Sequence, residues 1–112
     1  MKTSNASTSE GVEVIIVEGD IDMHVSPKFR DLLLNVFKRK AKGVVVDLSG
    51  VPFMDSSGIA TLVEGLRWSK NEGTRFILAG LQENVSHTLK LSKLTDFFEI
   101  SSTQADAISS IG

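Results

Sequence analysis

Hydrophobic residues in this chain gather in short β-branched runs that alternate with longer stretches of helical period. The runs VEVIIV at 12–17, GVVVDL at 43–48 and RFILAG at 75–80 each have the length and composition of a buried strand. Two stretches between them repeat apolar residues at the spacing of a helix with one face on a core. These residues are Phe29, Leu32, Leu33, Val36 and Phe37 in the first stretch, and Ile59, Leu62, Val63 and Leu66 in the second.

The boundaries of the two helices follow from their flanking residues. Ser26 precedes Pro27, and a serine that accepts a hydrogen bond from a free amide, followed by proline at the first helical position, is a typical helix start. The second helix is predicted from about Ser57 to Asn71, with Gly73 after its end. Basic residues 38–40 follow the first helix, where they complement the negative end of its dipole.

The last third of the chain has weaker patterns. Residues 82–92 have a partial helical period, FFEI at 97–100 predicts a short strand, and Thr103 with Asp106 forms a capping box before a last short helix. From Gly11 onward the order is β-α-β-α-β-α-β-α, which predicts an α/β sheet with right-handed parallel crossovers. Residues 1–10 are small and polar, so we expect a loose arm or at best a weak edge strand ahead of a domain over residues 11–112.

Composition narrows the functional classes. A length of 112 residues, with 41% hydrophobic and 23% charged residues, fits one soluble domain. No apolar stretch reaches the ~20 residues that span a bilayer, and MKTSNASTSE lacks the apolar centre of a signal peptide, so we expect a cytoplasmic protein without membrane contact. The absence of cysteine and the separation of His24 from His87 argue against a metal site, and no cofactor is expected. A net charge of −2 argues against nucleic-acid binding.

The segment SGVPFMDSSG at 49–58 carries the candidate chemistry, because the working groups of open α/β sheets usually follow the carboxyl ends of strands. Asp55, Ser56 and Ser57 are all cap-type residues, although one cap would suffice. In the simplest interpretation, Asp55 or Ser56 only caps the helix. In the alternative, a phosphoserine at the helix start is stabilised by the first-turn amides and adds about −2 of charge beside Asp55, which would switch off binding to a partner.

These segments resemble a known family. VVVDLSGVPFMDSSGIATLVEGLRWSKNEG at 44–73 is similar to the central strand, loop and helix of the STAS family, in particular the bacterial anti-sigma factor antagonists, whose D-S-[SA]-G motif carries a phosphorylated serine, here Ser56. VEGDIDMHVSPKF at 17–29 resembles the family's G-[DE]-[LI]-D segment, whose loop lies near that serine, so Asp20 and Asp22 are its expected neighbours. The resemblance covers about residues 11–105 and implies a mixed sheet of four or five strands with about four helices. The family's first strand would fall within residues 1–10, where KTSNASTS has almost no β pattern.

The resemblance implies a protein that switches partners and is not itself an enzyme. Unphosphorylated, it would bind an anti-sigma factor serine kinase; the kinase would phosphorylate Ser56 with ATP, and a metal-dependent serine phosphatase would reverse the modification. It would act as a monomer or a weak homodimer. The residues expected to contact the partner are Asp20, Asp22, His24, Met54, Asp55, Ser57, Gly58, Ile59 and Thr61.

Three residues raise separate questions. Gly58 lies in the first helical turn, where alanine would favour the helix by up to about 1 kcal/mol, so its glycine indicates close approach by another backbone or by a partner. His24 is either a partner contact or a solvated loop residue. Trp68 lies opposite the apolar stripe of its helix and is either a partner anchor or a side chain folded over a neighbouring helix.

Other functional classes fit less well. A serine hydrolase needs a G-x-S-x-G elbow and a histidine base, and S-S-G here lacks the leading glycine. Neither G-x-x-x-x-G-K-[ST] nor G-x-G-x-x-G, the two motifs that bind nucleotide phosphates, occurs in the chain. The main alternative is a STAS module that serves as a scaffold subunit of a stress-signalling or lipid-transport complex.

Overall fold

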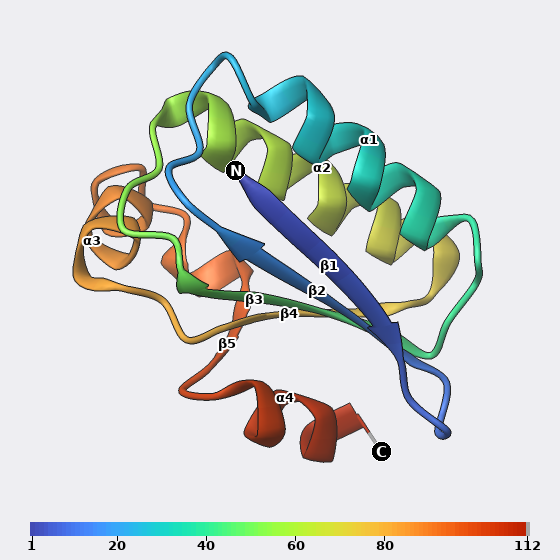
Figure 1. Ribbon diagram of the computed structural model, residues 1–112. Coiled ribbons are helices and arrows are strands. Elements are labelled where there is room, and N and C mark those ends of the chain that lie inside the picture. Colours follow the sequence, from blue (N-terminus) through green and yellow to red (C-terminus); the bar gives the residue numbers. More distant parts are fainter. Residues whose placement is uncertain (112) are drawn as a thin grey trace.

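Five strands form one mixed sheet in the computed structural model, which describes residues 1–111 (Figure 1). The strands, in their order across the sheet, are β1 (Lys2–Ser7), β2 (Val12–Glu18), β3 (Gly43–Gly50), β4 (Arg75–Ala79) and β5 (Glu99–Ser101). β1 pairs with β2 in the antiparallel sense, and the other pairs are parallel. The predicted α/β class with a mixed sheet is confirmed.

Helices cover both faces of the sheet. They are α1 (Ser26–Phe37), α2 (Ser56–Glu72), α3 (Glu83–Leu91) and α4 (Gln104–Ile111), and a short 3-10 helix, η1 (Thr95–Phe97), precedes β5. Figure 1 shows α1 and α2 side by side over one face and α4 over the other. The predicted number of helices, about four, is also confirmed.

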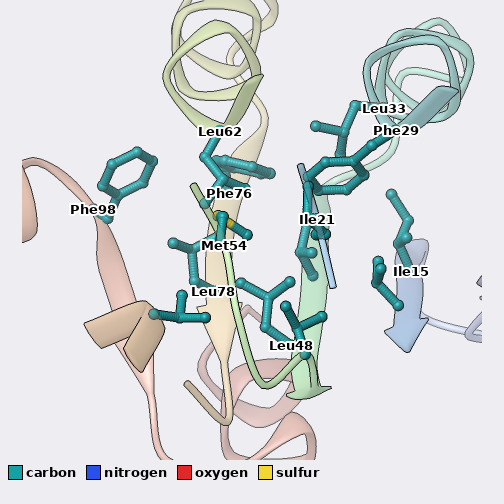
Figure 2. Close-up of a cluster of buried hydrophobic side chains, with 14 of the residues drawn as sticks. Ile15, Ile21, Phe29, Leu33, Leu48, Met54, Leu62, Phe76, Leu78 and Phe98 are labelled. Atoms are coloured by element: carbon teal, nitrogen blue, oxygen red, sulfur yellow. The ribbon is translucent and has the colours of Figure 1, made fainter. Parts of the chain in front are cut away.

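The central strands are buried on both faces, which explains their unbroken apolar runs. In β3, Val44 and Val46 face α1 and α2, whereas Val45 faces α4. The larger core lies under α1 and α2 (Figure 2) and includes Ile15, Phe29, Leu33, Leu48, Leu62, Phe76 and Leu78. The smaller core lies under α4 and consists of Val12, Val14, Val45, Ile77, Ala79 and Ala107.

The first residues of the chain form an edge strand and not a loose arm. All six residues of β1 are exposed, and its ladder with β2 runs from Lys2↔Glu18 to Ser7↔Glu13. Backbone groups make such a ladder whatever the side chains are, so a strand that packs on no core has no apolar period in its sequence. The antiparallel pairing also places the start of the chain at the end of β2, where Met1 lies beside Gly19.

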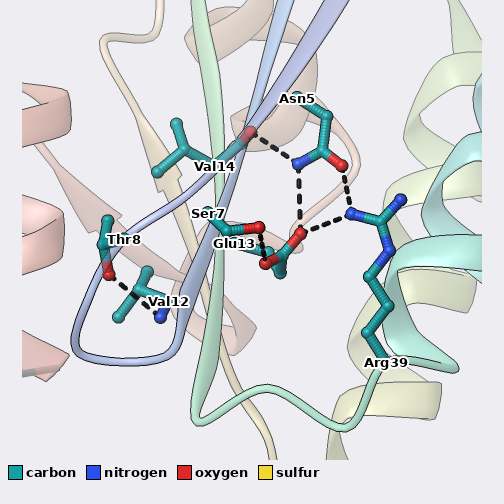
Figure 3. Close-up of polar contacts among 7 residues, drawn as sticks. All are labelled: Asn5, Ser7, Thr8, Val12, Glu13, Val14 and Arg39. Atoms are coloured by element: carbon teal, nitrogen blue, oxygen red, sulfur yellow. Dashed lines mark hydrogen bonds and ion pairs between the residues drawn. The ribbon is translucent and has the colours of Figure 1, made fainter.

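A buried carboxylate connects β1 to the rest of the domain (Figure 3). Glu13 on β2 is 6% exposed and accepts hydrogen bonds from Asn5 Nδ2 at 3.3 Å and from the Ser7 hydroxyl. Arg39, which follows α1, donates from Nη1 to Glu13 Oε1 at 2.6 Å. Burial by itself raises the pKa of Glu13, but the hydrogen bonds from Ser7, Arg39 and Asn5 outweigh it and hold the pKa below its ordinary value.

The start of α1 differs from the prediction that Ser26 caps it. Val25 occupies the cap position without a side-chain hydrogen bond, and Ser26 is the first helical residue. Asp22 instead orders the turn before the helix, because its Oδ1 accepts from the backbone N–H groups of His24 at 2.9 Å and Val25 at 3.3 Å, and its carbonyl accepts from the Ser26 N–H at 2.9 Å. The Ser26 hydroxyl donates to the Asp22 carbonyl at 2.8 Å.

Of the two alternatives for Trp68, a partner anchor or a side chain folded over a neighbouring helix, the structure shows the second. Its ring packs edge-on against Phe37 of α1, with the centroids 6.2 Å apart, and the Arg30 guanidinium lies 5.4 Å from its centroid. Arg30 is held there by an ion pair of 2.6 Å with Glu64 of α2.

Helix α2 begins at Ser56, one residue earlier than predicted.

The Glu13 cluster predicts how β1 responds to mutation and to acid. Because the folded pKa of Glu13 lies below its ordinary value, the cluster's stabilisation is present above that ordinary value and is lost as the pH falls through the folded pKa. In Arg39→Met we expect the β1 amides to exchange hydrogen about fivefold faster at neutral pH, since a half-exposed ion pair contributes about 1 kcal/mol. The difference from the wild-type protein should shrink in acid, and hydrogen exchange followed by NMR measures it.

Lys38→Met is the matched control for Arg39→Met. Lys38 is an exposed cation one residue away, and it forms no ion pair with any of residues 1–111. Its variant should therefore leave exchange in β1 unchanged. Equal β1 exchange rates in Arg39→Met and the wild-type protein would contradict the role of the cluster.

Candidate functional site

Two loops at the carboxyl end of the sheet lie side by side. The loop after β2 and the loop after β3 are joined by hydrogen bonds from the Ile21 N–H to the Phe53 carbonyl at 3.0 Å and from the Asp55 N–H to the Ile21 carbonyl at 3.1 Å. These bonds continue the parallel pairing of β2 with β3 beyond the sheet. The predicted proximity of residues 20–22 to the serine loop is confirmed.

Asp55 is the residue that caps α2. Its Oδ1 accepts from the backbone N–H groups of Ser57 at 2.9 Å and Gly58 at 3.3 Å. The Ser57 hydroxyl donates to the same oxygen at 2.5 Å, and this bond is the main reason that the pKa of Asp55 lies below its ordinary value. The carboxylate is therefore ionised at neutral pH, and two of the free first-turn amides are already paired with an anion.

Ser57 joins the two helices that meet at the site. Its Oγ lies 2.7 Å from the Oγ of Ser26, at the start of α1. Its carbonyl accepts a hydrogen bond from the Thr61 hydroxyl at 3.0 Å, one turn along α2. Ser57 is partly buried, and its hydroxyl contacts both Asp55 and Ser26, so this side chain supports the loop from inside.

Ser56 is the first residue of α2 and differs from both of its neighbours. Its side chain is exposed, and its hydroxyl makes no hydrogen bond with any of residues 1–111. The three cap-type residues therefore have three separate positions. Asp55 caps the helix, Ser57 links it to α1, and Ser56 presents a free hydroxyl to other molecules.

The residues predicted to contact a partner divide by exposure. Those that are at least partly exposed are Asp20, Asp22, His24, Asp55 and Ser57. Those that are buried are Met54, Gly58, Ile59 and Thr61. Met54, Gly58 and Thr61 lie beneath the surface of the loop, whereas Ile59 lines the hollow beside Ser56.

Gly58 is approached closely by its own chain. A Cβ at this position would lie 2.3 Å from Met54 Cγ and 3.0 Å from Ile21 Cγ2. Met54 is 1% exposed and fills the space between the two loops, so the first turn of α2 has no room for a side chain beside it. The expectation that another backbone or a partner approaches Gly58 is replaced by this internal contact.

Two exposed apolar side chains beside the site were not predicted. Met23, in the loop after β2, is 69% exposed, and Phe53, in the loop after β3, is 42% exposed. Neither belongs to a periodic pattern, and the only signal in the sequence is a large apolar residue within an expected loop. A third residue was also missed: Asn84 of α3 holds the loop by accepting a hydrogen bond from the Met54 N–H at 3.2 Å, a contact that only the folded chain brings about.

A shallow groove of about 440 Å³ begins at Ser56 and follows α2. Ala60, Val63 and Arg67 line its α2 side, and Leu94, after α3, lines the opposite side. The site thus combines a free hydroxyl, a mildly apolar groove and acidic residues on the neighbouring loop. This arrangement suits recognition by another protein.

The described part of the chain shows no catalytic or metal-binding constellation at this hydroxyl. Residues 1–111 contain no group of three or more His, Cys, Asp or Glu side chains that could hold a metal ion. Among these residues, no helix has both the length and the apolar character needed to cross a membrane. Among the same residues, no base makes a hydrogen bond with the Ser56 hydroxyl.

Known proteins share this architecture. A family model described as STAS domain matches residues 3–107. An anti-sigma-B factor antagonist from Listeria monocytogenes is 29% identical over 94 residues, which are 82% of this chain and 81% of that protein. The solved structure of an anti-sigma factor antagonist from Mycobacterium paratuberculosis has a TM-score of 0.89 at 25% identity, covering 98% of this chain and 92% of that one. The structure of SpoIIAA, a Bacillus cell fate determinant, in its phosphorylated form has a TM-score of 0.77 at 20% identity, covering 99% and 100%.

The contact between Gly58 and Met54 predicts a stability effect. In Gly58→Ala the new methyl group overlaps Met54, so we expect the free energy of unfolding to fall by about 1–3 kcal/mol despite the higher helix propensity of alanine. In a Met54→Ala background the methyl group has room, and the same substitution should cost little or should stabilise the protein. Urea denaturation of the two single variants and the double variant measures this coupling. An equal cost in both backgrounds would contradict the contact.

Proposed function

Because the chain belongs to the STAS domain family, we propose that it is an anti-sigma factor antagonist whose binding to its partner is switched off by phosphorylation of Ser56. The observation that carries the proposal is the free, exposed hydroxyl of Ser56 beside the ionised cap Asp55. The partner is an anti-sigma factor that is also a serine kinase, and the protein acts in the cytoplasm. Support comes from the Listeria relative named as an anti-sigma-B factor antagonist and from SpoIIAA, which is structurally similar and has a phosphorylated form.

The chemistry at Ser56 makes this chain a substrate and a ligand. The Ser56 oxygen forms a bond to the γ-phosphorus of ATP, the bond from that phosphorus to the bridging oxygen of ADP breaks, and a base of the kinase accepts the hydroxyl proton. A serine phosphatase transfers the phosphoryl group to water and restores the hydroxyl. Neither step uses a catalytic group of this chain, because no base contacts the Ser56 hydroxyl and Asp55 Oδ1 is occupied by Ser57 and Gly58.

The effect of the phosphate follows from the position of Asp55. A phosphoserine carries about −1.5 to −2 of charge at neutral pH, and a helix N-terminus normally stabilises such an anion through its free amides. Here Asp55 already accepts from the amides of Ser57 and Gly58, so the phosphate does not gain these donors without displacing the cap. Its charge therefore stays at the surface, next to a second anion, and repels a partner that fits the unmodified loop.

The surface around Ser56 supports a protein partner in the unmodified state. Met23 and Phe53 are exposed on the two paired loops, and large apolar side chains at the centre of an interface contribute much of its binding free energy. The exposed carboxylate of Asp20 and the partly exposed carboxylate of Asp22 lie on the same loop as Met23, so they add orientation and charge selectivity. We assign partner contact to these side chains, to His24 and to the groove along α2.

The test uses the cognate kinase with labelled ATP. Ser56→Ala should abolish labelling and still bind the kinase, whereas Ser56→Asp should weaken binding at least about tenfold, which corresponds to about 1.4 kcal/mol. Mass spectrometry locates the phosphate, and calorimetry measures the dissociation constants.

Ser57→Ala is the matched control, because it removes a hydroxyl one residue away that is partly buried and hydrogen-bonded. This variant should be labelled at Ser56 like the wild-type protein. Full labelling of Ser56→Ala, or equally tight kinase binding by the protein phosphorylated at Ser56, would refute the mechanism.

A further inference from the structure

Two side chains at the start of α3 hold the segment that leads from β3 to Ser56. Figure 1 shows α3 beside this segment. Gln82 Nε2 donates a hydrogen bond of 2.7 Å to the Ser49 carbonyl, near the end of β3. Asn84 Oδ1 accepts a hydrogen bond of 3.2 Å from the Met54 N–H, two residues before Ser56. The segment is therefore attached to α3 at both of its ends.

The bond from Met54 completes a strand-like pattern in the loop. The Phe53 carbonyl and the Asp55 N–H both pair with the backbone of Ile21, on the side of β2. In an extended chain, backbone groups of successive residues point to opposite sides, so the Met54 N–H faces away from Ile21. No strand lies on that side of the loop, and the only acceptor that the N–H finds among residues 1–111 is Asn84.

Neither side chain serves the helix that carries it. Gln82 occupies the cap position of α3 without a side-chain hydrogen bond to the helix. Asn84 is the second helical residue, and asparagine lowers helix stability at positions other than the cap. Both amides are directed to the backbone of the neighbouring loop instead, one as a donor and the other as an acceptor.

The helix that carries these two amides is firmly placed. Val85 and Leu89 of α3 are fully buried in the core under α1 and α2. Gly80, between β4 and α3, has a φ of +68°, and a Cβ there would lie 3.0 Å from Ser49 Cβ. The missing side chain at Gly80 lets the connection from β4 to α3 pass next to Ser49. The two amides are thus attached to the core and hold the loop against it.

We propose that Asn84 and Gln82 are positioning residues for the phosphorylation of Ser56, a role that rests on the proposed function. Neither contacts the Ser56 hydroxyl, so they act by holding the loop in the conformation that the kinase binds. A kinase must place the acceptor oxygen in line with the phosphorus of ATP. A loop that is already held in place avoids the loss of conformational entropy on binding.

Loss of either bond should raise the KM of phosphorylation and leave kcat nearly unchanged, because the bound loop still reaches the same position. Asn84→Ala removes the acceptor and should raise KM about fivefold, the effect of about one neutral hydrogen bond. The experiment measures initial rates of labelling by the cognate kinase at saturating ATP, on fully folded protein well below its thermal midpoint.

Two acidic substitutions separate the hydrogen bonds from the effect of charge. Asn84→Asp keeps an acceptor for the Met54 N–H, whereas Gln82→Glu replaces the donor to the Ser49 carbonyl with a second acceptor. Each adds one negative charge at the start of α3. Gln82→Glu should therefore raise KM about fivefold, and Asn84→Asp should stay near the wild-type value.

Hydrogen exchange followed by NMR reports the order of the loop without a kinase. The Met54 amide should exchange at least about fivefold faster in Asn84→Ala and near the wild-type rate in Asn84→Asp. Ser86→Ala is the matched control, because Ser86 is exposed on the same helix and its hydroxyl makes no hydrogen bond with any of residues 1–111. This control should change neither Met54 exchange nor KM.

Three results would overturn the positioning role: unchanged KM in both Asn84→Ala and Gln82→Glu, an equal rise of KM in Asn84→Asp and Asn84→Ala, or unchanged Met54 exchange in Asn84→Ala. Each leaves the proposed function intact, provided that the wild-type protein is labelled at Ser56. A wild-type protein that is not labelled at Ser56 would instead refute the proposed function, and this role would fall with it.

Discussion

The site depends on the backbone hydrogen bonds by which Ile21 joins the loop after β3 to the loop after β2. β2 and β3 are parallel and buried on both faces, so their register is set by the core, and the paired loops inherit that register. Met54 fills the space beneath the loops, and the absence of a side chain at Gly58 lets α2 begin directly above it. The position of Ser56 is therefore a consequence of sheet packing more than of the local loop sequence.

Asp55, Ser56 and Ser57 have separate roles, as helix cap, exposed hydroxyl and link to α1, and these roles connect the packing to the proposed function. A cap that already holds the first-turn amides makes the helix start stable without help from a modified residue. A charge added at Ser56 then has no need to reorganise the fold, and it acts on whatever approaches the surface. In the proposed switch, phosphorylation of Ser56 would therefore change the partner's affinity without a change of fold.

The strands and helices whose apolar residues recur at a regular spacing could be predicted from the sequence. The contacts that depend on which distant residues meet after folding could not. The runs at 12–17, 43–48 and 75–80 are strands because burial on both faces demands unbroken apolar residues. For residues 1–10 the sequence predicted only a loose arm or a weak edge strand, because the hydrogen bonds that join β1 to β2 use backbone groups and its side chains are all exposed. The cap of α1 was assigned to Ser26, whereas Ser26 is already the first helical residue and Asp22 orders the turn before it.

At the candidate site, too, the local segments could be predicted but the contacts between distant residues could not. The segment at 49–58 could be located from strand, turn and helix signals, and its adjacency to residues 20–22 came from the family resemblance. The contact that requires glycine at 58 could not be seen, since it depends on where Met54 falls after folding. Met23 and Phe53 were missed because isolated apolar residues in loops carry no period.

The antiparallel course of β1 has a practical consequence for anyone who handles this protein. Because β1 runs back along β2, the amino group of Met1 emerges beside Gly19, next to the loop that carries Asp20 (Figure 1). An affinity tag, fluorophore or fusion partner attached ahead of Met1 would therefore lie beside the loop that carries Asp20, at the end of the sheet where Ser56 is found. Ile111 packs at Gly43, the opposite end of β3, so labels attached after the last helix leave the serine loop unobstructed.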